Sequence, residues 1–197
     1  MEKRIAAVHR KTGETDITME LSLDGSGKAE VSTGIGFFDH MMDAFTRHGL
    51  FDLTLKAEGD LRVDGHHTVE DTGIVLGEAI SNAVGDKKGI RRYGFFVLPM
   101  DEALILCAVD LCGRPYFAME GAPITAPMVG DFDTQLVREF FYAVSYSAAM
   151  NLHFRILSGT NAHHIIEGMF KCFSKALDMA TQKEDRITDV LSTKGSL

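Results

Sequence analysis

The chain of 197 residues has no tryptophan, few prolines and only three cysteines, and its acidic residues outnumber the basic ones by 28 to 20. The formal net charge of −8 argues against a duplex nucleic-acid binder, because phosphate contacts need a basic surface. No apolar run approaches the ~18 residues of a transmembrane helix, and the first residues have no apolar core of signal-peptide length. These absences predict a soluble globular protein that does not interact with membranes.

The cysteines give a further prediction about the compartment. Cys107, Cys112 and Cys172 are odd in number and scattered along the chain. A disulfide framework needs paired cysteines and an oxidising environment, so we expect a reducing, cytoplasmic location. The three side chains are predicted to be small core residues without a metal.

The eight histidines carry the strongest signal in the sequence. Four of them form two HH pairs, and each pair is followed by glutamate at the same offset, in His66–Glu70 and in His163–Glu167. A motif that occurs twice prompts a search for an internal repeat. The segments that correspond are Ile17–Gly25 with Leu104–Gly113, Phe37–Phe45 with Arg138–Tyr146, Leu53–Gly59 with Leu152–Gly159, and Glu14 with Glu102. We therefore predict two half-domains, residues 1–92 and 93–185, followed by a C-terminal tail, residues 186–197.

Each half has the same predicted elements. Alternating apolar residues predict strands over 17–23 and 53–59, and helical spacing predicts helices over 38–48 and 66–84, the last one ending at Gly85. The second half repeats the pattern and ends in a helix. The extra segment Met119–Asp131 contains glycines and prolines and is expected to be an irregular loop. The predicted fold class is α+β, with helices packed on one face of each sheet.

The HHxxE motifs predict metal binding. On a helix, residues four apart share one face, so His66 and Glu70 can hold one ion. The neighbouring His67 points about 100° away and should serve a different ion or role. The second motif repeats this arrangement, so we expect two metal sites between half-domains or between subunits. Such ligands suit Zn²⁺, Fe²⁺, Ni²⁺ or Mn²⁺, and affinity order alone favours zinc over manganese. The alternative is solvated histidines at helix N-termini.

Several longer motifs point to one family. In chain order they are STGIGFFDHMMDAFTRHGLFDL, DGHHTVEDTGIVLGEAI, GIRRYG, DEALILCAVDLCGRPY, NAHHIIEGMFKCFSKAL and STKG. Together they resemble the imidazoleglycerol-phosphate dehydratase family over nearly the whole chain. The resemblance implies a tandem duplication of a half-domain with a four-stranded sheet covered by two helices on one face. It also implies a homo-oligomer, a 24-mer built from trimers, with active sites at subunit contacts.

The same resemblance implies the activity. Members are hydro-lyases that convert D-erythro-imidazole-glycerol phosphate to imidazole-acetol phosphate in histidine biosynthesis. They use two Mn²⁺ ions per subunit in a di-metal site that binds the imidazolate of the substrate. The residues at positions that match family metal ligands are His40, His66, His67, Glu70, His163, His164 and Glu167. The positions that match substrate contacts are Glu14, His40, His48, Arg92, Arg114, Lys171, Ser192 and Lys194.

One position departs from the family pattern. Many members have VEHFF where this chain has Val137–Phe141, so Glu139 stands in the place of a histidine ligand. A carboxylate can replace imidazole at a hard Mn²⁺ ion, and Glu139 is therefore expected to be a ligand. The alternative is a surface charge, with water at that coordination place.

The sequence alone leaves two questions open. The catalytic candidates for proton transfer are Glu14 and Glu167, and the sequence does not assign the steps between them. A metal-dependent hydrolase or a non-catalytic metal-binding cage protein would also use His/Glu clusters. The hydrolase would not require two equivalent half-domains or an imidazole-sized pocket. The cage protein would not require Arg92, Arg114 and the STKG tail, which suit a phosphorylated substrate.

Overall fold

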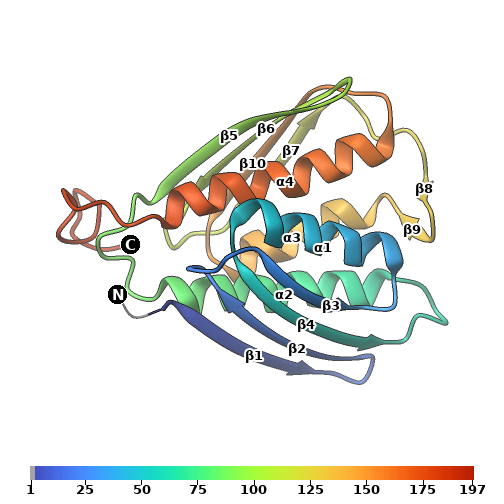
Figure 1. Ribbon diagram of the computed structural model, residues 1–197, viewed down its shortest axis with the longest axis horizontal. Coiled ribbons are helices and arrows are strands. Elements are labelled where there is room, and N and C mark those ends of the chain that lie inside the picture. Colours follow the sequence, from blue (N-terminus) through green and yellow to red (C-terminus); the bar gives the residue numbers. More distant parts are fainter. Residues whose placement is uncertain (1–2) are drawn as a thin grey trace.

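Each half of the chain forms a four-stranded sheet that is covered by helices on one face, as the computed structural model of residues 3–197 shows (Figure 1). The elements of the first half are β1 (Ile5–Lys11), β2 (Thr15–Ser22), β3 (Lys28–Ser32), α1 (Gly36–Gly49), β4 (Asp52–Gly59) and α2 (His66–Val84). Those of the second half are β5 (Tyr93–Met100), β6 (Ala103–Asp110), β7 (Tyr116–Gly121), α3 (Leu136–Ser147), β10 (Asn151–Ser158) and α4 (Ala162–Thr181).

The two sheets have the same topology. Their strand orders are β1-β2-β4-β3 and β5-β6-β10-β7. In each sheet three strands pair antiparallel, and the last strand, β3 or β7, pairs parallel with its neighbour. The predicted tandem duplication of a four-stranded α+β unit is therefore confirmed.

The helices form a central layer between the two sheets (Figure 1). Strand β2 shows why the sheets face inward, since Ile17, Met19 and Leu21 alternate with polar residues and are almost completely buried. Between the sheets, α1 packs against α4 and α2 packs against α3. Each of these helix pairs joins one helix from the first half to one from the second. The two halves consequently share one core, in which the rings of Phe38, Phe140 and Phe170 contact one another.

The local predictions were accurate where periodicity was strong. Helix α2 spans His66–Val84 and ends at Gly85 (φ 63°), a left-handed residue that favours glycine. The prediction of an irregular loop over Met119–Asp131 was wrong in part, because β7 continues to Gly121 and the short strands β8 (Met128–Val129) and β9 (Phe132–Asp133) form a hairpin. Gly130 (φ 61°) begins the tight turn of that hairpin, so this glycine permits the pairing instead of breaking it.

The three cysteines are buried and unpaired, as predicted for core residues. Burial raises the pKa of Cys172 to about 12, which keeps this thiol protonated and unreactive. Among residues 3–197, no helix is both long enough and apolar enough to cross a bilayer.

Candidate active site

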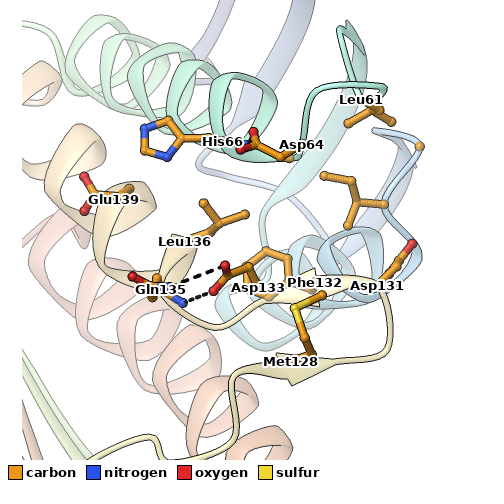
Figure 2. Close-up of a pocket in the computed structure, with 13 residues that line it drawn as sticks. Leu61, Asp64, His66, Met128, Asp131, Phe132, Asp133, Gln135, Leu136 and Glu139 are labelled. Carbon is orange, nitrogen blue, oxygen red and sulfur yellow. Dashed lines mark hydrogen bonds between the residues drawn. The ribbon is translucent and has the colours of Figure 1, made fainter.

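The first HHxxE motif lies at the N-terminal end of α2. His66 Nε2 and Glu70 Oε2 are 3.7 Å apart on one face of the helix, as their spacing predicts. Glu139 of α3 lines the same pocket as His66 because α3 packs along α2 (Figure 2). The structure therefore places His66 beside Glu70 and brings Glu139 from the second half to the pocket that His66 lines.

The second motif, at the N-terminal end of α4, forms a tighter cluster. Glu167 Oε2 lies 3.0 Å from His163 Nε2 and 3.5 Å from His40 Nε2, and His40 comes from α1 of the other half. The donor atoms of these three residues lie within 4.8 Å of one another. Glu167 is buried, and Lys171 Nζ is 2.6 Å from its other oxygen. Burial disfavours the charged carboxylate, but Lys171 and His163 outweigh it and lower the pKa of Glu167.

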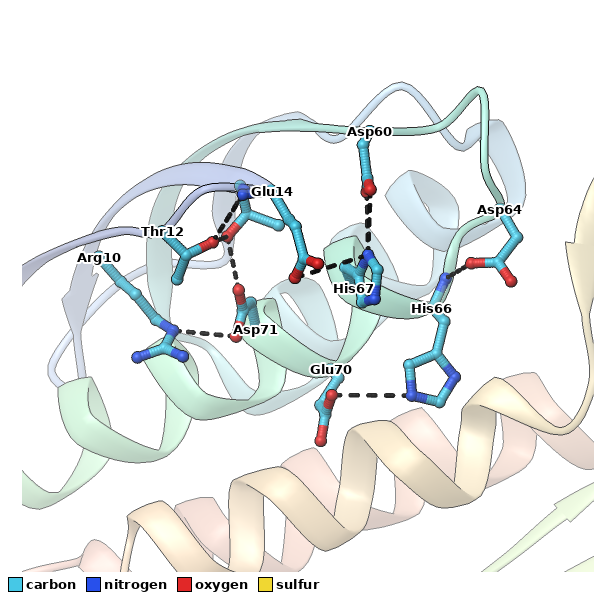
Figure 3. Close-up of polar contacts among 10 residues, drawn as sticks. Arg10, Thr12, Glu14, Asp60, Asp64, His66, His67, Glu70 and Asp71 are labelled. Carbon is cyan, nitrogen blue, oxygen red and sulfur yellow. Dashed lines mark hydrogen bonds and ion pairs between the residues drawn. The ribbon is translucent and has the colours of Figure 1, made fainter.

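The second histidine of each pair faces a different set of carboxylates. Both carboxylate oxygens of Asp60 lie 3.1 Å from His67 Nδ1, and Glu14 Oε2 lies 3.8 Å from it (Figure 3). The hydrogen bond to Asp60 raises the pKa of His67 despite some desolvation. Donor atoms of Glu14, Asp60 and His67 also lie within 4.8 Å of one another.

On the other motif, His164 Nδ1 lies 2.7 Å from Glu102 Oε2, and Asp101 Oδ2 lies 3.6 Å from His164 Nε2. The hydrogen bond to Glu102 raises the pKa of His164. Sequence reasoning missed Asp60 and the role of Glu102. Two signals in the sequence were available. Asp60 directly follows Gly59, which ends the strand before the first motif, and Glu102 corresponds to Glu14 in the repeat.

The chemistry of these donors fits a divalent transition metal. Each cluster offers imidazole nitrogens together with carboxylate oxygens, a mixed set that borderline ions such as Mn²⁺, Fe²⁺ and Zn²⁺ accept. His66 Nε2 faces Glu70 and His67 Nδ1 faces Asp60, so the two histidines belong to different clusters.

The residues expected to bind phosphate gather elsewhere. Arg92, Arg114, Ser192 and Lys194 line one pocket together with the rest of the tail. Arg92 Nε and Nη2 donate to the two oxygens of Asp110, at 2.7 and 3.1 Å, while Nη1 donates to the carbonyl of Leu191 at 2.7 Å. The tail is thus folded over the cationic pocket and is not a free terminus.

Two further predicted substrate contacts are His48 of α1 and Lys171 of α4, two helices that pack against each other. Burial, followed by the nearby charge of Lys171, lowers the pKa of His48. Lys171 itself is paired with Glu167 and does not line the arginine pocket. Within one chain, His48 and Lys171 therefore belong to the neighbourhood of the His40 cluster.

The N-terminal ends of α2 and α4, which carry the HHxxE motifs, lie at the opposite end of the central helices from the C-terminal tail, which lines the arginine pocket (Figure 1). Arg92 N–H donates to the carbonyl of Ala180 in the last turn of α4, at 2.9 Å, whereas Glu167 is near the first turn. At 1.5 Å per residue, these two positions are roughly 20 Å apart along the helix. One small substrate cannot contact both regions of the same chain.

Comparisons with known proteins identify one family. The sequence profile of the family "Imidazoleglycerol-phosphate dehydratase" matches residues 33–177. The chain is 62% identical to the imidazoleglycerol-phosphate dehydratase of Lachnoclostridium phytofermentans, over 98% of both chains, and 60% identical to that of Acetivibrio thermocellus, over 96% of this chain and 97% of the other.

Solved structures of the family have the same fold. The imidazoleglycerol-phosphate dehydratase of Staphylococcus aureus superposes with a TM-score of 0.82 at 39% identity, covering 91% of this chain and 99% of the other. The enzyme of Pyrococcus furiosus gives a TM-score of 0.82 at 36% identity, covering 96% and 100%. With a matched profile over most of its length and relatives of 60% and 62% identity, this chain belongs to the imidazoleglycerol-phosphate dehydratase family.

Proposed function

We propose that this hydro-lyase removes water from D-erythro-imidazole-glycerol phosphate and releases imidazole-acetol phosphate, a step of histidine biosynthesis, with two Mn²⁺ ions per subunit. Family membership supports the dehydratase activity. The cluster of His40, His163 and Glu167 supports one ion. The contact of His66 with Glu70, at a pocket that Glu139 also lines, supports the other. One ion would be held by His40, His163 and Glu167, and the other by His66, Glu70 and Glu139. His67 and His164, on other helix faces, would reach ions shared with neighbouring subunits.

The reaction needs a base and an electron-accepting ring. The hydroxyl on the carbon beside the imidazole leaves, a proton is lost from the next carbon, and the resulting enol takes a proton to become the ketone. Bound metal ions would supply Lewis acidity and orient the imidazole ring. The protein must then place a carboxylate at the carbon that loses its proton.

The environment of the two glutamates favours Glu14 for that proton transfer. Its side chain is 57% exposed, and its carboxylate lies beside His67 at 3.8 Å without a closer partner among the described residues. Glu167 is instead buried and held by Lys171 and His163. A carboxylate held by two cations suits a metal ligand, whereas a free one can accept and return a proton.

The arginine pocket would bind the phosphate of the substrate. Arginine offers fixed pairs of donors to phosphate oxygens. Asp110 and Leu191 occupy three donors of Arg92, so this guanidinium is held in place, and Arg114 at the same pocket donates only a long 3.4 Å bond to the carbonyl of Cys112. Ser192 and Lys194 would close over the phosphate from the tail.

The separation along α4 is the observation that carries the proposed assembly. Because the metal clusters and the arginine pocket are roughly 20 Å apart within a chain, a complete site requires the clusters of one subunit and the arginine pocket of another. A homo-oligomer follows, and we propose the 24-mer built from trimers. The unpaired buried cysteines are consistent with a location in the cytoplasm.

Mixing two inactive variants tests both the activity and the shared site. Glu14→Gln removes the proposed base, which lies beside the metal clusters, and Arg114→Ala removes a donor of the phosphate pocket. If the variants are dissociated with chelator, mixed in equal amounts and reassembled with Mn²⁺, about a quarter of the sites should regain both functional sides in a symmetric oligomer. The assay follows absorbance of the enolised ketone from imidazole-glycerol phosphate. Wild-type protein without activity would contradict the proposed reaction, and a mixture without recovery would contradict the shared site.

A further inference from the structure

The duplicated halves hold the second histidine of each HH pair in different ways. Glu14 and Glu102 occupy equivalent places, each directly before the second strand of its sheet, β2 or β6. Glu102 contacts His164 Nδ1 at 2.7 Å, whereas Glu14 stays 3.8 Å from His67 Nδ1. In the first half the closer carboxylate is that of Asp60, at 3.1 Å. The two equivalent glutamates therefore have unequal environments.

Glu102 is fixed by several hydrogen bonds. Its Oε1 accepts the backbone N–H groups of Thr160 at 3.0 Å and Asn161 at 2.7 Å, and its Oε2 accepts from His164. Two backbone N–H donors fix the orientation of the carboxylate and leave its second oxygen directed at His164. A glutamate carboxylate is ordinarily ionised at neutral pH and then accepts hydrogen bonds only.

The connecting loops explain the difference. In the first half, residues 60–65 lead from Gly59 to α2, and in the second, residues 160–161 lead from Gly159 to α4. The shorter loop brings two backbone N–H groups onto Glu102 and places Thr160 where the first half has Asp60. The second half therefore has no carboxylate at this place in the loop, and Glu102 contacts the histidine instead.

We propose that Glu102 is a positioning residue for His164, as Asp60 is for His67, and that this division leaves Glu14 free for proton transfer. The inference depends on the metal-binding part of the proposed function. An ionised carboxylate at Nδ1 requires hydrogen on Nδ1, so the lone pair is on Nε2 and would be available to an ion. Asp101 Oδ2 lies 3.6 Å from Nε2 of His164. Both halves thus achieve the same tautomer through residues that do not correspond in the repeat.

The substitution Glu102→Gln should reverse this tautomer while preserving shape. The backbone donors at Thr160 and Asn161 hold the amide oxygen, which turns the amide NH₂ group toward His164. Nδ1 must then accept a hydrogen bond, and the ring hydrogen moves to Nε2. An Nε2 that carries hydrogen cannot bind a metal ion.

Four variants form a matched test in chelator-treated protein titrated with Mn²⁺ by calorimetry. Glu102→Gln and Asp60→Ala should each weaken one class of site by roughly 10–100-fold, the usual effect of removing a carboxylate that orients a histidine ligand. The controls at the corresponding positions, Glu14→Gln and Thr160→Ala, should bind Mn²⁺ with wild-type affinity. Circular dichroism confirms that each variant is folded.

A second measurement reports the tautomer directly. In metal-free protein labelled with ¹⁵N-histidine, His164 Nδ1 should change from a protonated to an unprotonated nitrogen shift in Glu102→Gln and remain unchanged in Thr160→Ala. Wild-type affinity in Glu102→Gln, or weakened affinity in Glu14→Gln equal to that in Asp60→Ala, would overturn the inference. Wild-type protein that binds no Mn²⁺ would instead overturn the proposed metal function. If Glu102→Gln does not fold, weaker Mn²⁺ binding in Asp60→Ala than in Glu14→Gln supports the inference, and equal binding in these two variants contradicts it.

Discussion

Asp71 of α2 accepts a 2.5 Å hydrogen bond from the hydroxyl of Thr15, at the start of β2. Both side chains are buried, and the other oxygen of Asp71 accepts from Arg10 Nε at 2.9 Å (Figure 3). These bonds tie the β1–β2 hairpin to α2. Since the hairpin turn carries Glu14 and the helix carries His67, Asp71 sets the distance between the two.

Replacing this aspartate should affect both stability and rate. Asp71→Asn weakens the contacts with Arg10 and Thr15 at a buried place, which should cost about 1–3 kcal/mol. It should also lower kcat, because Glu14 is no longer held over His67. Thermal melts and steady-state kinetics measure the two effects. Glu20→Gln, on the exposed face of β2, is the control and should change neither.

The proposed base is tested by Glu14→Gln. This change keeps the shape of the side chain but removes its ability to accept a proton, so kcat should fall by roughly 10²–10⁴-fold. Metal content should stay near that of the wild type, because Asp60 and not Glu14 is the close partner of His67. Loss of bound Mn²⁺ in elemental analysis of the variant would identify Glu14 as a ligand instead.

The C-terminal tail should contribute to activity by contacting the phosphate of the substrate. Deleting Ser192–Leu197 removes Ser192 and Lys194 from the arginine pocket but leaves the pairing of Lys88 with Val190. KM should rise strongly while the fold is kept, and kcat should fall as well, since remote binding energy also serves the reacting centre. Kinetics of the truncated protein check this. An unchanged kcat/KM would mean that the tail does not contact the substrate.

Metal removal should dissociate the assembly. If ions bridge subunits, their binding free energy also stabilises the oligomer. Chelator should therefore give a small oligomer, a trimer by our proposal, and Mn²⁺ should restore the 24-mer. Low pH should act in the same direction, because histidine must be neutral to bind metal and its reference pKa is about 6.5. Size-exclusion chromatography with light scattering measures the size.

Two kinds of variant separate the bridging ligands from the phosphate pocket. His67→Ala and His164→Ala should each weaken assembly, since each removes a proposed bridging ligand. Arg114→Ala should assemble normally and bind substrate poorly, because Arg114 lies in the arginine pocket and not in the metal clusters. A metal-free particle that remains at full size would contradict the bridging role.

Acid stability should depend on Asp24. Arg4 donates to both oxygens of this carboxylate, at 2.6 and 2.9 Å, and these bonds lower the pKa of Asp24 despite partial burial. A carboxyl whose folded-state pKa lies below the unfolded one stabilises the protein above the unfolded value, about 3.9, and this stabilisation is lost as pH falls through the folded value.

The corresponding measurement compares Asp24→Asn with the wild type at equal protein concentration. The variant should melt at a lower temperature at pH 7, and the difference should shrink as pH falls below 4. Glu30→Gln, which changes an exposed carboxylate of β3, is the control and should melt like the wild type at pH 7. A difference in melting temperature that is the same at pH 7 and pH 3 would exclude the Arg4 contact as its cause.

Much of this protein can be read from local patterns. The periodicity of residues 66–84 and the glycine that follows determine a helix, and the i, i+4 spacing then places His66 beside Glu70 and His163 beside Glu167. The repeat likewise determines two sheets of one topology. These features depend on residues that are near one another in the chain.

The tertiary structure decided how the halves combine. Packing of α1 on α4 and of α3 on α2 brings His40 to the second motif and Glu139 to the first, and the length of one loop decides whether Asp60 or Glu102 orients a histidine. It also sets Arg92 at the far end of α4 from the metal clusters. Such pairings depend on which apolar faces bury one another across distant parts of the chain, and the periodicity of a single segment is the same whichever partner covers it.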